Sequence, residues 1–195
     1  MSALIVHDNE TYENEVFKAL DVSDELLRDV SFYNCRFVGS SFQFADLRGC
    51  AFEKCTFSNC NLALAKFHNT KFIGAVFNDS KLLGINWGST GVVISASYVN
   101  CLLDSSIFSD MNLGKVKFIS CSMVEASFLN TKLVRVKFDD CDLKRCQFSQ
   151  ADLSSADFST SRNYYMNASS NKLHKTVFSL PEAVSLLANL DIKLK

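Results

Sequence analysis

The stretch that decides the fold is residues 50–62, CAFEKCTFSNCNL. A cysteine stands at every fifth position, at Cys50, Cys55 and Cys60, and a large apolar residue follows two places after each of them. Three explanations can account for this spacing: a metal site, a set of disulfides, or a wall of packed side chains. The sequence on either side of the stretch decides between them.

The same five-residue period runs through most of the chain. Large apolar residues recur at every fifth position from Phe32 to Trp87, and again from Leu103 to Phe158. Small residues usually precede each of them by two positions. The two runs differ in phase by one residue, so we expect a break in the register within residues 88–102.

A period of five fits neither an α-helix nor a β-strand, whose side chains repeat every 3.6 and 2 residues. A chain that turns a corner after each short extended piece can point the same two positions inward every time. Stacked coils of this kind complete one another's cores, as in a solenoid. The absence of proline before Pro181 agrees, because proline is excluded from paired strands.

The cysteines all occupy the small inward position, where alanine, serine, threonine and valine stand in other repeats. Zinc sites need paired CxxC spacings or histidine partners, which are missing here. We therefore predict free thiols in a packed wall. All phenylalanines except Phe44 and Phe178 fall on the period, counting Phe17 on an N-terminal extension. The predicted core stack includes Phe52, Phe57, Phe72, Phe118, Phe138, Cys55, Cys121 and Cys141.

Composition narrows the function. The net charge is −1, so no overall field favours nucleic acid or a membrane surface. The apolar runs are too short to span a bilayer, and the N-terminal segment lacks the basic start of a signal peptide. We expect a cytoplasmic protein with reduced cysteines. A filled solenoid offers no obvious cleft, and no catalytic motif is present, so we expect neither an enzyme nor a cofactor.

The repeat small–polar–Leu/Phe–x–x resembles the pentapeptide-repeat family. Stretches such as ADLRG, CTFSN, AKFHN, ADLSS and ADFST carry the resemblance, which covers roughly residues 30–160. The family implies an all-β solenoid, a right-handed quadrilateral β-helix with four repeats and about twenty residues per coil. Stacking at this interval would align Lys115 with Arg135 and Lys117 with Lys137.

The ends of the chain depart from the repeat. Residues 1–29 predict an N-terminal cap and irregular first coil, residues 30–161 the β-helix, and residues 162–195 a C-terminal cap and dimerisation segment. Ser179 and Glu182 are spaced as a capping box, so a short α-helix is expected at about 180–190. Its apolar stripe consists of Leu180, Val184, Leu187 and Leu190.

This tail, and the break after Trp87, are similar to those of the Qnr-type and albicidin-resistance group of the family. The resemblance implies a homodimer joined through the C-terminal helices. It also implies binding to DNA gyrase and topoisomerase IV, and protection of these enzymes from quinolones. Members of this group are rods that mimic DNA in size and charge.

The surface charge departs from that pattern, because the chain has 21 acidic and 20 basic residues. DNA mimicry requires a negative surface, whereas residues 31–145 lean basic. We do not expect direct nucleic-acid binding. An alternative function is a scaffold that binds another protein through a flat face of the rod. An apolar girdle is also expected from the outward positions of Ile119, Val124, Leu129 and Val134. The candidate partner surface consists of Lys115, Lys117, Arg135, Lys137, Val124 and Val134.

Overall fold

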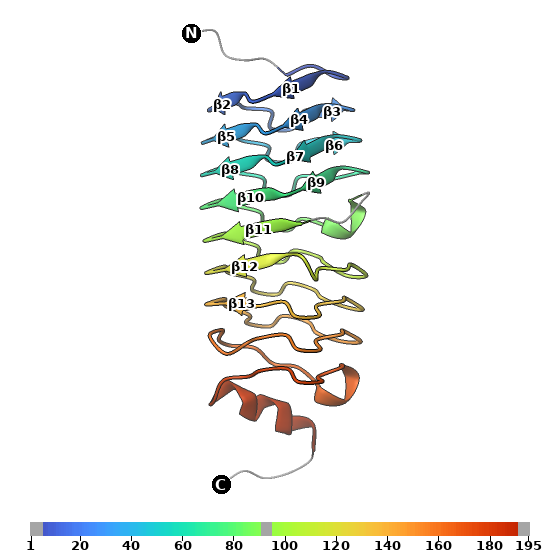
Figure 1. Cartoon of the computed structure of the whole chain (residues 1–195), viewed down its shortest axis with the longest axis vertical. Helices are drawn as coiled ribbons and strands as arrows, with labels where there is room; N and C mark the ends of the chain where they lie inside the picture. The colour runs from blue at the N-terminus through green and yellow to red at the C-terminus, as the bar shows by residue number, and fades with distance from the viewer. Residues whose placement is uncertain (1–5, 91–94, 191–195) are drawn as a thin grey trace.

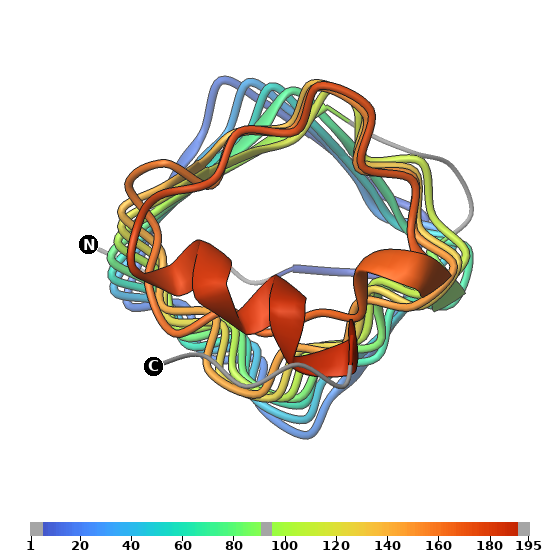
Figure 2. The ribbon, with the colours of Figure 1, turned by 90° about the horizontal axis from the view of Figure 1, so that it is seen from below.

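The chain forms a four-sided rod of stacked coils (Figures 1 and 2). The computed structural model describes residues 6–90 and 95–190, without the side chains of 188–190. All strand pairs are parallel, and each coil places its residues directly over those of the coil before it. The predicted all-β solenoid is confirmed.

Face 1 is the sheet β1 (Thr11–Glu13), β4 (Ser31–Tyr33), β7 (Ala51–Glu53) and β9 (Lys71–Ile73). Face 2 carries the longest sheet: β2 (Val16–Lys18), β5 (Arg36–Val38), β8 (Thr56–Ser58), β10 (Ala75–Asn78), β11 (Ala96–Val99), β12 (Lys117–Ile119) and β13 (Phe138–Asp139). Face 3 is held by isolated parallel bridges such as Leu102↔Ser122. Face 4 contains β3 (Leu26–Arg28) and β6 (Asp46–Arg48), followed by bridges.

The corners between faces explain why the period is five. The residue two places after most large inward residues has a positive φ, as at Asn34 (52°) and Asn59 (54°). Asparagine, aspartate and glycine adopt this left-handed conformation at little cost, and they fill many of the corners. Two inward positions, two outward positions and one left-handed corner therefore make up each repeat.

Aromatic rings form continuous ladders inside the rod. On face 2, neighbouring rings are stacked with centroids 4.7–5.5 Å apart and interplanar angles of 3–17°. The members of this ladder are Phe17, Phe37, Phe57, Phe77, Tyr98, Phe118, Phe138, Phe158 and Phe178. Phe52 and Phe72 stack in a second ladder on face 1, with centroids 5.1 Å apart. Each buried ring contributes roughly 1.5–3 kcal/mol to stability.

The small inward position also has a hydrogen-bonding role. Many of its thiols and hydroxyls donate to the carbonyl of the large residue 23 positions earlier, as Cys55 does to Phe32 (3.4 Å) and Thr131 to Phe108 (2.9 Å). That carbonyl points into the core, where an unpaired acceptor would be costly. The position therefore accepts small side chains in general, and a thiol or hydroxyl there adds a hydrogen bond that alanine or valine cannot make.

The eight cysteines are free and buried. Burial raises the pKa of Cys50 to about 11 and that of Cys55 to about 12. Cys121 stands in one column of the core with Cys101 and Cys141. Among the described residues, no group of three or more cysteine, histidine or acidic side chains could hold a metal ion.

The coil length changes once along the rod. Phe77 pairs with Phe57, which is 20 residues earlier, and with Tyr98, which is 21 residues later. The extra residue is accommodated between Trp87 and Tyr98, in a stretch that contains the 3₁₀-helix η1 (Trp87–Ser89). Part of the predicted break, residues 91–94, lies outside the described residues. Since Tyr98 continues the ring ladder, the core passes through the change without a gap.

The parallel ladder extends beyond residue 161. Asp157 bridges to Val177, and Phe178 stacks on Phe158 with centroids 5.5 Å apart. The prediction that Phe178 lies outside the repeat was wrong, because it stands one full coil after Phe158. A second 3₁₀-helix, η2 (Ala168–Ser170), forms one corner of this last coil.

The predicted α-helix at 180–190 is instead a 3₁₀-helix, η3 (Glu182–Leu190). The Val184 N–H bonds to the Pro181 carbonyl, three residues back, at 3.0 Å. The backbone hydrogen bond expected of a capping box does not form: the Ser179 N–H donates to the Tyr164 hydroxyl (3.0 Å), and the Glu182 carboxylate accepts the Ser179 hydroxyl instead, at 3.5 Å. Contact with the last coil thus decides how this segment starts.

Candidate functional site

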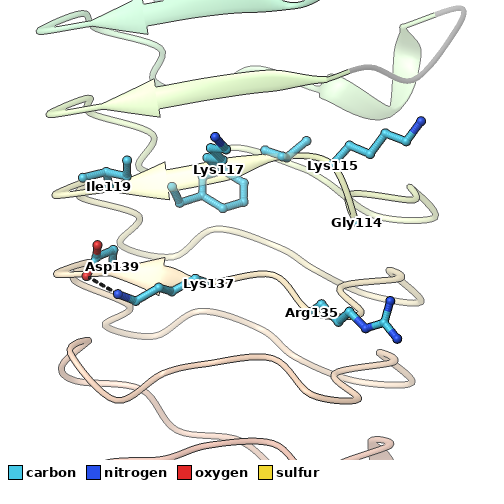
Figure 3. A pocket seen from close by; sticks show the side chains of 9 residues that line it. Gly114, Lys115, Lys117, Ile119, Arg135, Lys137 and Asp139 are labelled. Atoms are coloured by element: carbon cyan, nitrogen blue, oxygen red, sulfur yellow. Dashed lines mark ion pairs between the residues drawn. The ribbon is translucent and has the colours of Figure 1, made fainter.

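Four basic residues of the candidate partner surface surround a hollow on the side of the rod (Figure 3). Lys115 and Arg135 lie at the corner between faces 1 and 2 in successive coils, and Lys117 and Lys137 lie on face 2 beside them. The hollow has a volume of about 360 Å³. We call it the basic hollow; its lining residues are Gly114, Lys115, Val116, Lys117, Phe118, Ile119, Arg135, Lys137 and Asp139.

Local backbone geometry makes this hollow. The N–H of Val116 donates to the carbonyl of Leu113 at 2.8 Å, which closes the corner that carries Lys115. Gly114 contributes no side chain to the wall, and a methyl group there would meet only ordinary van der Waals neighbours. In the next coil, the corresponding corner has Arg135 in the left-handed conformation, with φ at 61°. Lys115 and Arg135 thus lie at the same corner in successive coils, and the space beside Gly114 is left open.

The cations of the basic hollow differ in their partners. Lys137 forms an ion pair with Asp139, with 3.1 Å between Nζ and Oδ1. This hydrogen bond from Lys137, together with one from Thr160, lowers the pKa of Asp139. In the described part of the chain, no carboxylate lies within ion-pair distance of Lys115, Lys117 or Arg135. These three exposed cations are therefore available to an anion from outside.

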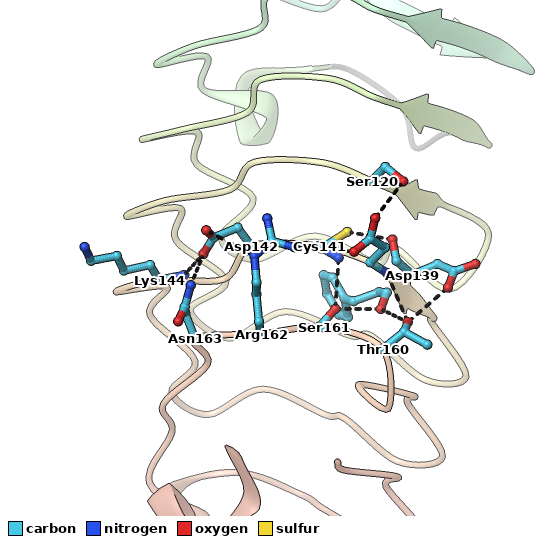
Figure 4. A network of polar contacts seen from close by, with 11 residues as sticks. Ser120, Asp139, Cys141, Asp142, Lys144, Thr160, Ser161, Arg162 and Asn163 are labelled. Carbon is cyan, nitrogen blue, oxygen red and sulfur yellow. Dashed lines mark hydrogen bonds and ion pairs between the residues drawn. The ribbon is translucent and has the colours of Figure 1, made fainter. Parts of the chain in front are cut away.

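A polar network fixes the far side of the ion pair (Figure 4). Thr160 donates to Asp139 at 3.0 Å, and its hydroxyl accepts the backbone N–H of Asp140 at 3.0 Å. Arg162 forms ion pairs with two aspartates, with 3.4 Å between its Nη1 and Oδ1 of Asp140 and 3.6 Å between its Nε and Oδ2 of Asp142. Asp139 is thus paired with Lys137, while Asp140 and Asp142 share the single positive charge of Arg162.

The two valines of the candidate partner surface lie apart from each other. Val134 directly precedes Arg135 on face 1, where it is exposed beside the basic hollow. Val124 is half-buried on face 3, on the opposite side of the coil, where its N–H donates to Asp104. Ile119 lines the hollow, and Leu129 is exposed on face 4. The structure therefore brings only Ile119 and Val134 to the basic hollow.

The stripe predicted for a dimer interface lies at the end of the rod. Leu180 is 82% exposed, Val184 43% and Leu187 36%. The side chain of Leu190 lies outside the described residues. Leu186, on the other side of η3, packs against the core. The helix thus covers the last coil with one side and leaves an apolar stripe in solvent on the other.

The basic hollow is suited to binding an anion. It has four cations and one paired carboxylate, and among the described residues no histidine, cysteine or serine lines it. Gly114 and Asp139 were not recognised from the sequence as part of the site. A glycine at an outward position that isoleucine or tyrosine fills in other coils, as at Ile73 and Tyr33, was the available signal.

Among the described residues, none of the helices has the length and apolar character needed to cross a membrane.

Comparison with known proteins agrees with the coil architecture. A family model described as a pentapeptide repeat region matches residues 16–92 and 93–167. No curated protein matches the chain.

Solved structures resemble the rod over nearly its whole length. One form of QnrB1, a plasmid-mediated fluoroquinolone resistance protein, is 18% identical over 97% of this chain and 99% of that chain, with a TM-score of 0.62. HetL, a pentapeptide repeat protein involved in heterocyst differentiation regulation from the cyanobacterium Nostoc sp. strain PCC 7120, is 16% identical. The match covers 89% of this chain and 88% of HetL, with a TM-score of 0.68. At these identities the similarity concerns the fold.

Proposed function

We propose a function from one premise, that this chain belongs to the pentapeptide-repeat family. In this proposal the chain is a non-enzymatic, cytoplasmic binding protein whose partner is DNA gyrase or topoisomerase IV. By binding, it modulates the enzyme's response to quinolone-type inhibitors.

The observation that carries this proposal is the match in both length and architecture with a fluoroquinolone resistance protein. The similarity extends over 99% of that form of QnrB1, so it includes both ends of the rod as well as the repeats. The break after Trp87 and the apolar C-terminal segment, both noted in the sequence, are consistent with the same group. A filled rod with exposed flat sides is also suited to lie against a large protein.

The mode of contact differs from DNA mimicry. Arg162 offsets part of the negative charge of Asp140 and Asp142, while Lys115, Lys117 and Arg135 leave positive charge on another side of the rod. A surface of this kind competes poorly for a site built to hold DNA phosphates. We propose that the rod contacts an acidic area of its partner and does not replace DNA.

Dimerisation belongs to the same proposal. The exposed stripe of Leu180, Val184 and Leu187 at the end of the rod would be removed from water if two copies met end to end. Such a contact would be isologous, since each copy offers the same stripe to the other. A dimer would place the two basic hollows at a fixed distance along a doubled rod.

The test is a gyrase supercoiling assay with the purified protein titrated in, with and without ciprofloxacin. Supercoiling that is restored in the presence of the drug supports a resistance role. Inhibition without the drug, and no rescue with it, would show binding that does not protect. No effect in either arm at a large molar excess would rule out gyrase as the partner, and the same assay with topoisomerase IV would then decide the proposal.

The alternative is a scaffold that binds a different protein through a flat face. The similarity to HetL supports it, because that protein is described as taking part in the regulation of differentiation and has the same architecture. The same fold therefore occurs in settings other than drug resistance. A pull-down that recovers a partner other than a topoisomerase, together with an unaffected supercoiling assay, would favour the scaffold.

A further inference from the structure

We propose that the basic hollow binds a short acidic segment of a partner protein, in extended conformation, through Lys115, Lys117 and Arg135. The inference rests on the proposed function only in that the chain acts as a binding protein. It does not depend on which protein is bound.

The arrangement of the cations favours a peptide. Lys115 and Arg135 stand one coil apart, a spacing of about 4.8 Å in a parallel sheet, and Lys117 lies two residues further along the same coil as Lys115. The hollow between them is about 360 Å³. Carboxylates on one side of an extended peptide recur at about 6.6 Å, so two or three of them can reach the group.

Within the described part of the chain, three of the four cations around the hollow are free of an ion pair. Lys137 is already paired with Asp139, which is also held by Thr160. The other three cations have no acidic partner among the residues that the structure describes. An incoming carboxylate therefore gains an interaction without breaking an existing ion pair, whereas contact with Lys137 would require competition with Asp139.

Nucleic acid is a poorer fit because the basic surface is short. At the corner that carries Lys115 and Arg135, the equivalent positions in the coils before and after are Ser95 and Ser155. The column of Lys117 and Lys137 ends in the same way, at Ser97 and Asp157. Uninterrupted positive charge in these two columns thus extends over two coils, and the net charge of the chain is −1. A duplex needs a longer basic track to release many counterions.

Apolar side chains at the basic hollow place a second requirement on the partner segment. Ile119 lines the hollow, and Val134 is exposed next to Arg135. A partner segment that alternates acidic and apolar residues can place its carboxylates on the cations and its apolar side chains on these two residues. The expected partner is therefore an acidic segment with interspersed apolar residues.

The fold itself supplies conservative variants. Serine fills the Lys115 and Arg135 corner position in neighbouring coils, and Ser97 pairs directly with Lys117. The triple variant K115S/K117S/R135S therefore uses a residue that the rod already accepts at these places. A matched control, K66S/K71S/K81S, removes three exposed cations from other places on the rod.

A second variant tests the shape of the site while every charge is kept. Gly114 has no left-handed φ, and a Cβ there would lie 3.5 Å from the Asn112 side chain and 3.6 Å from the Val134 carbonyl. Gly114→Ile should therefore fold normally, because Ile73 occupies the equivalent outward position on face 1. Its side chain would fill part of the hollow.

The experiment measures fluorescence anisotropy of a labelled peptide in which glutamate alternates with leucine and serine. A glutamine version of the peptide and a labelled DNA duplex serve as the other ligands. We expect the wild-type protein to prefer the glutamate peptide, with binding that weakens as salt is added. The triple variant should bind on the order of tenfold more weakly, Gly114→Ile should also lose affinity, and the control triple should bind like the wild type.

Three results would overturn the inference: equal loss of affinity in the control triple, equal binding of the glutamine peptide, or tighter binding of the duplex than of the peptide. The supercoiling assay separates this inference from the proposed function. If the protein acts on gyrase while the peptide does not bind, the inference fails and the proposed function stands. If the peptide binds as expected while both topoisomerases are unaffected, the proposed function fails and the site remains.

Discussion

The aromatic ladder of face 2 should be most sensitive to truncation in its middle. Phe57 is fully buried and stacks between Phe37 at 4.7 Å and Phe77 at 4.8 Å. Replacing it with alanine removes a buried ring, worth roughly 1.5–3 kcal/mol, and two stacking contacts worth about 0.5–1.5 kcal/mol each. We therefore expect Phe57→Ala to lower the free energy of unfolding by about 3–5 kcal/mol, the usual range for such a cavity.

The matched control is Phe178, the last ring of the same ladder. It is only partly buried and has one stacked neighbour, Phe158, at 5.5 Å. Phe178→Ala should therefore cost about 1–2 kcal/mol. Chemical denaturation reports both changes, because the single tryptophan, Trp87, is buried in the core. Equal losses in the two variants, or a loss below about 1 kcal/mol for Phe57→Ala, would refute the account of the ladder as a cooperative stack.

The remaining predictions concern corners, the end of the rod and the thiols. Gly39→Ala should cost about 1 kcal/mol in denaturation experiments, because its φ is +60° but no atom lies within 4 Å of the new methyl group. Gly49→Ala should cost more, since the methyl group would meet the carboxylate of Asp29 in the preceding coil and that side chain would have to turn away; equal costs would contradict this. Val184→Glu with Leu187→Glu should convert a dimer to a monomer in light scattering without a change in circular dichroism, and an unchanged mass would limit η3 to a capping role. Folding stability should fall as the pH rises above about 9, because buried thiols such as Cys55, whose folded pKa is raised to about 12, stay protonated while the unfolded chain ionises. Each such thiol contributes a loss of about 1.4 kcal/mol per pH unit in that window, and a stability that is flat from pH 8 to 11 would contradict the burial argument.

The period in the sequence was sufficient to predict the solenoid. Each coil repeats one local geometry, so inward positions such as Phe52 and Cys55 can be recognised from spacing alone. The position of Phe178 in the aromatic ladder could not be recognised in this way, because residues 162–177 carry no clear repeat although they form a coil. The capping-box pattern of Ser179 and Glu182 could not show that the Ser179 N–H bonds to Tyr164, 15 residues earlier, because that contact is not local.

The candidate site was predictable in part. Stacking at twenty residues places Lys115 next to Arg135 and Lys117 next to Lys137, and in the structure these pairs surround one hollow. The separation of Val124 from Val134 follows from the four corners of a coil, since residues ten positions apart lie on opposite faces. The role of Gly114 was out of reach, because a missing side chain defines a hollow only when its neighbours are placed.

The uniform coil makes the rod a molecular ruler. Below the register change, each added or deleted unit of 20 residues would move everything beyond it by one strand spacing, about 4.8 Å, while leaving the cross-section unchanged. The distance from the basic hollow to the C-terminal stripe can therefore change only in steps of one coil. Relatives that differ in length by one coil would present the same chemistry at a different reach, so the size of the partner could be matched by duplication instead of by redesign of a surface.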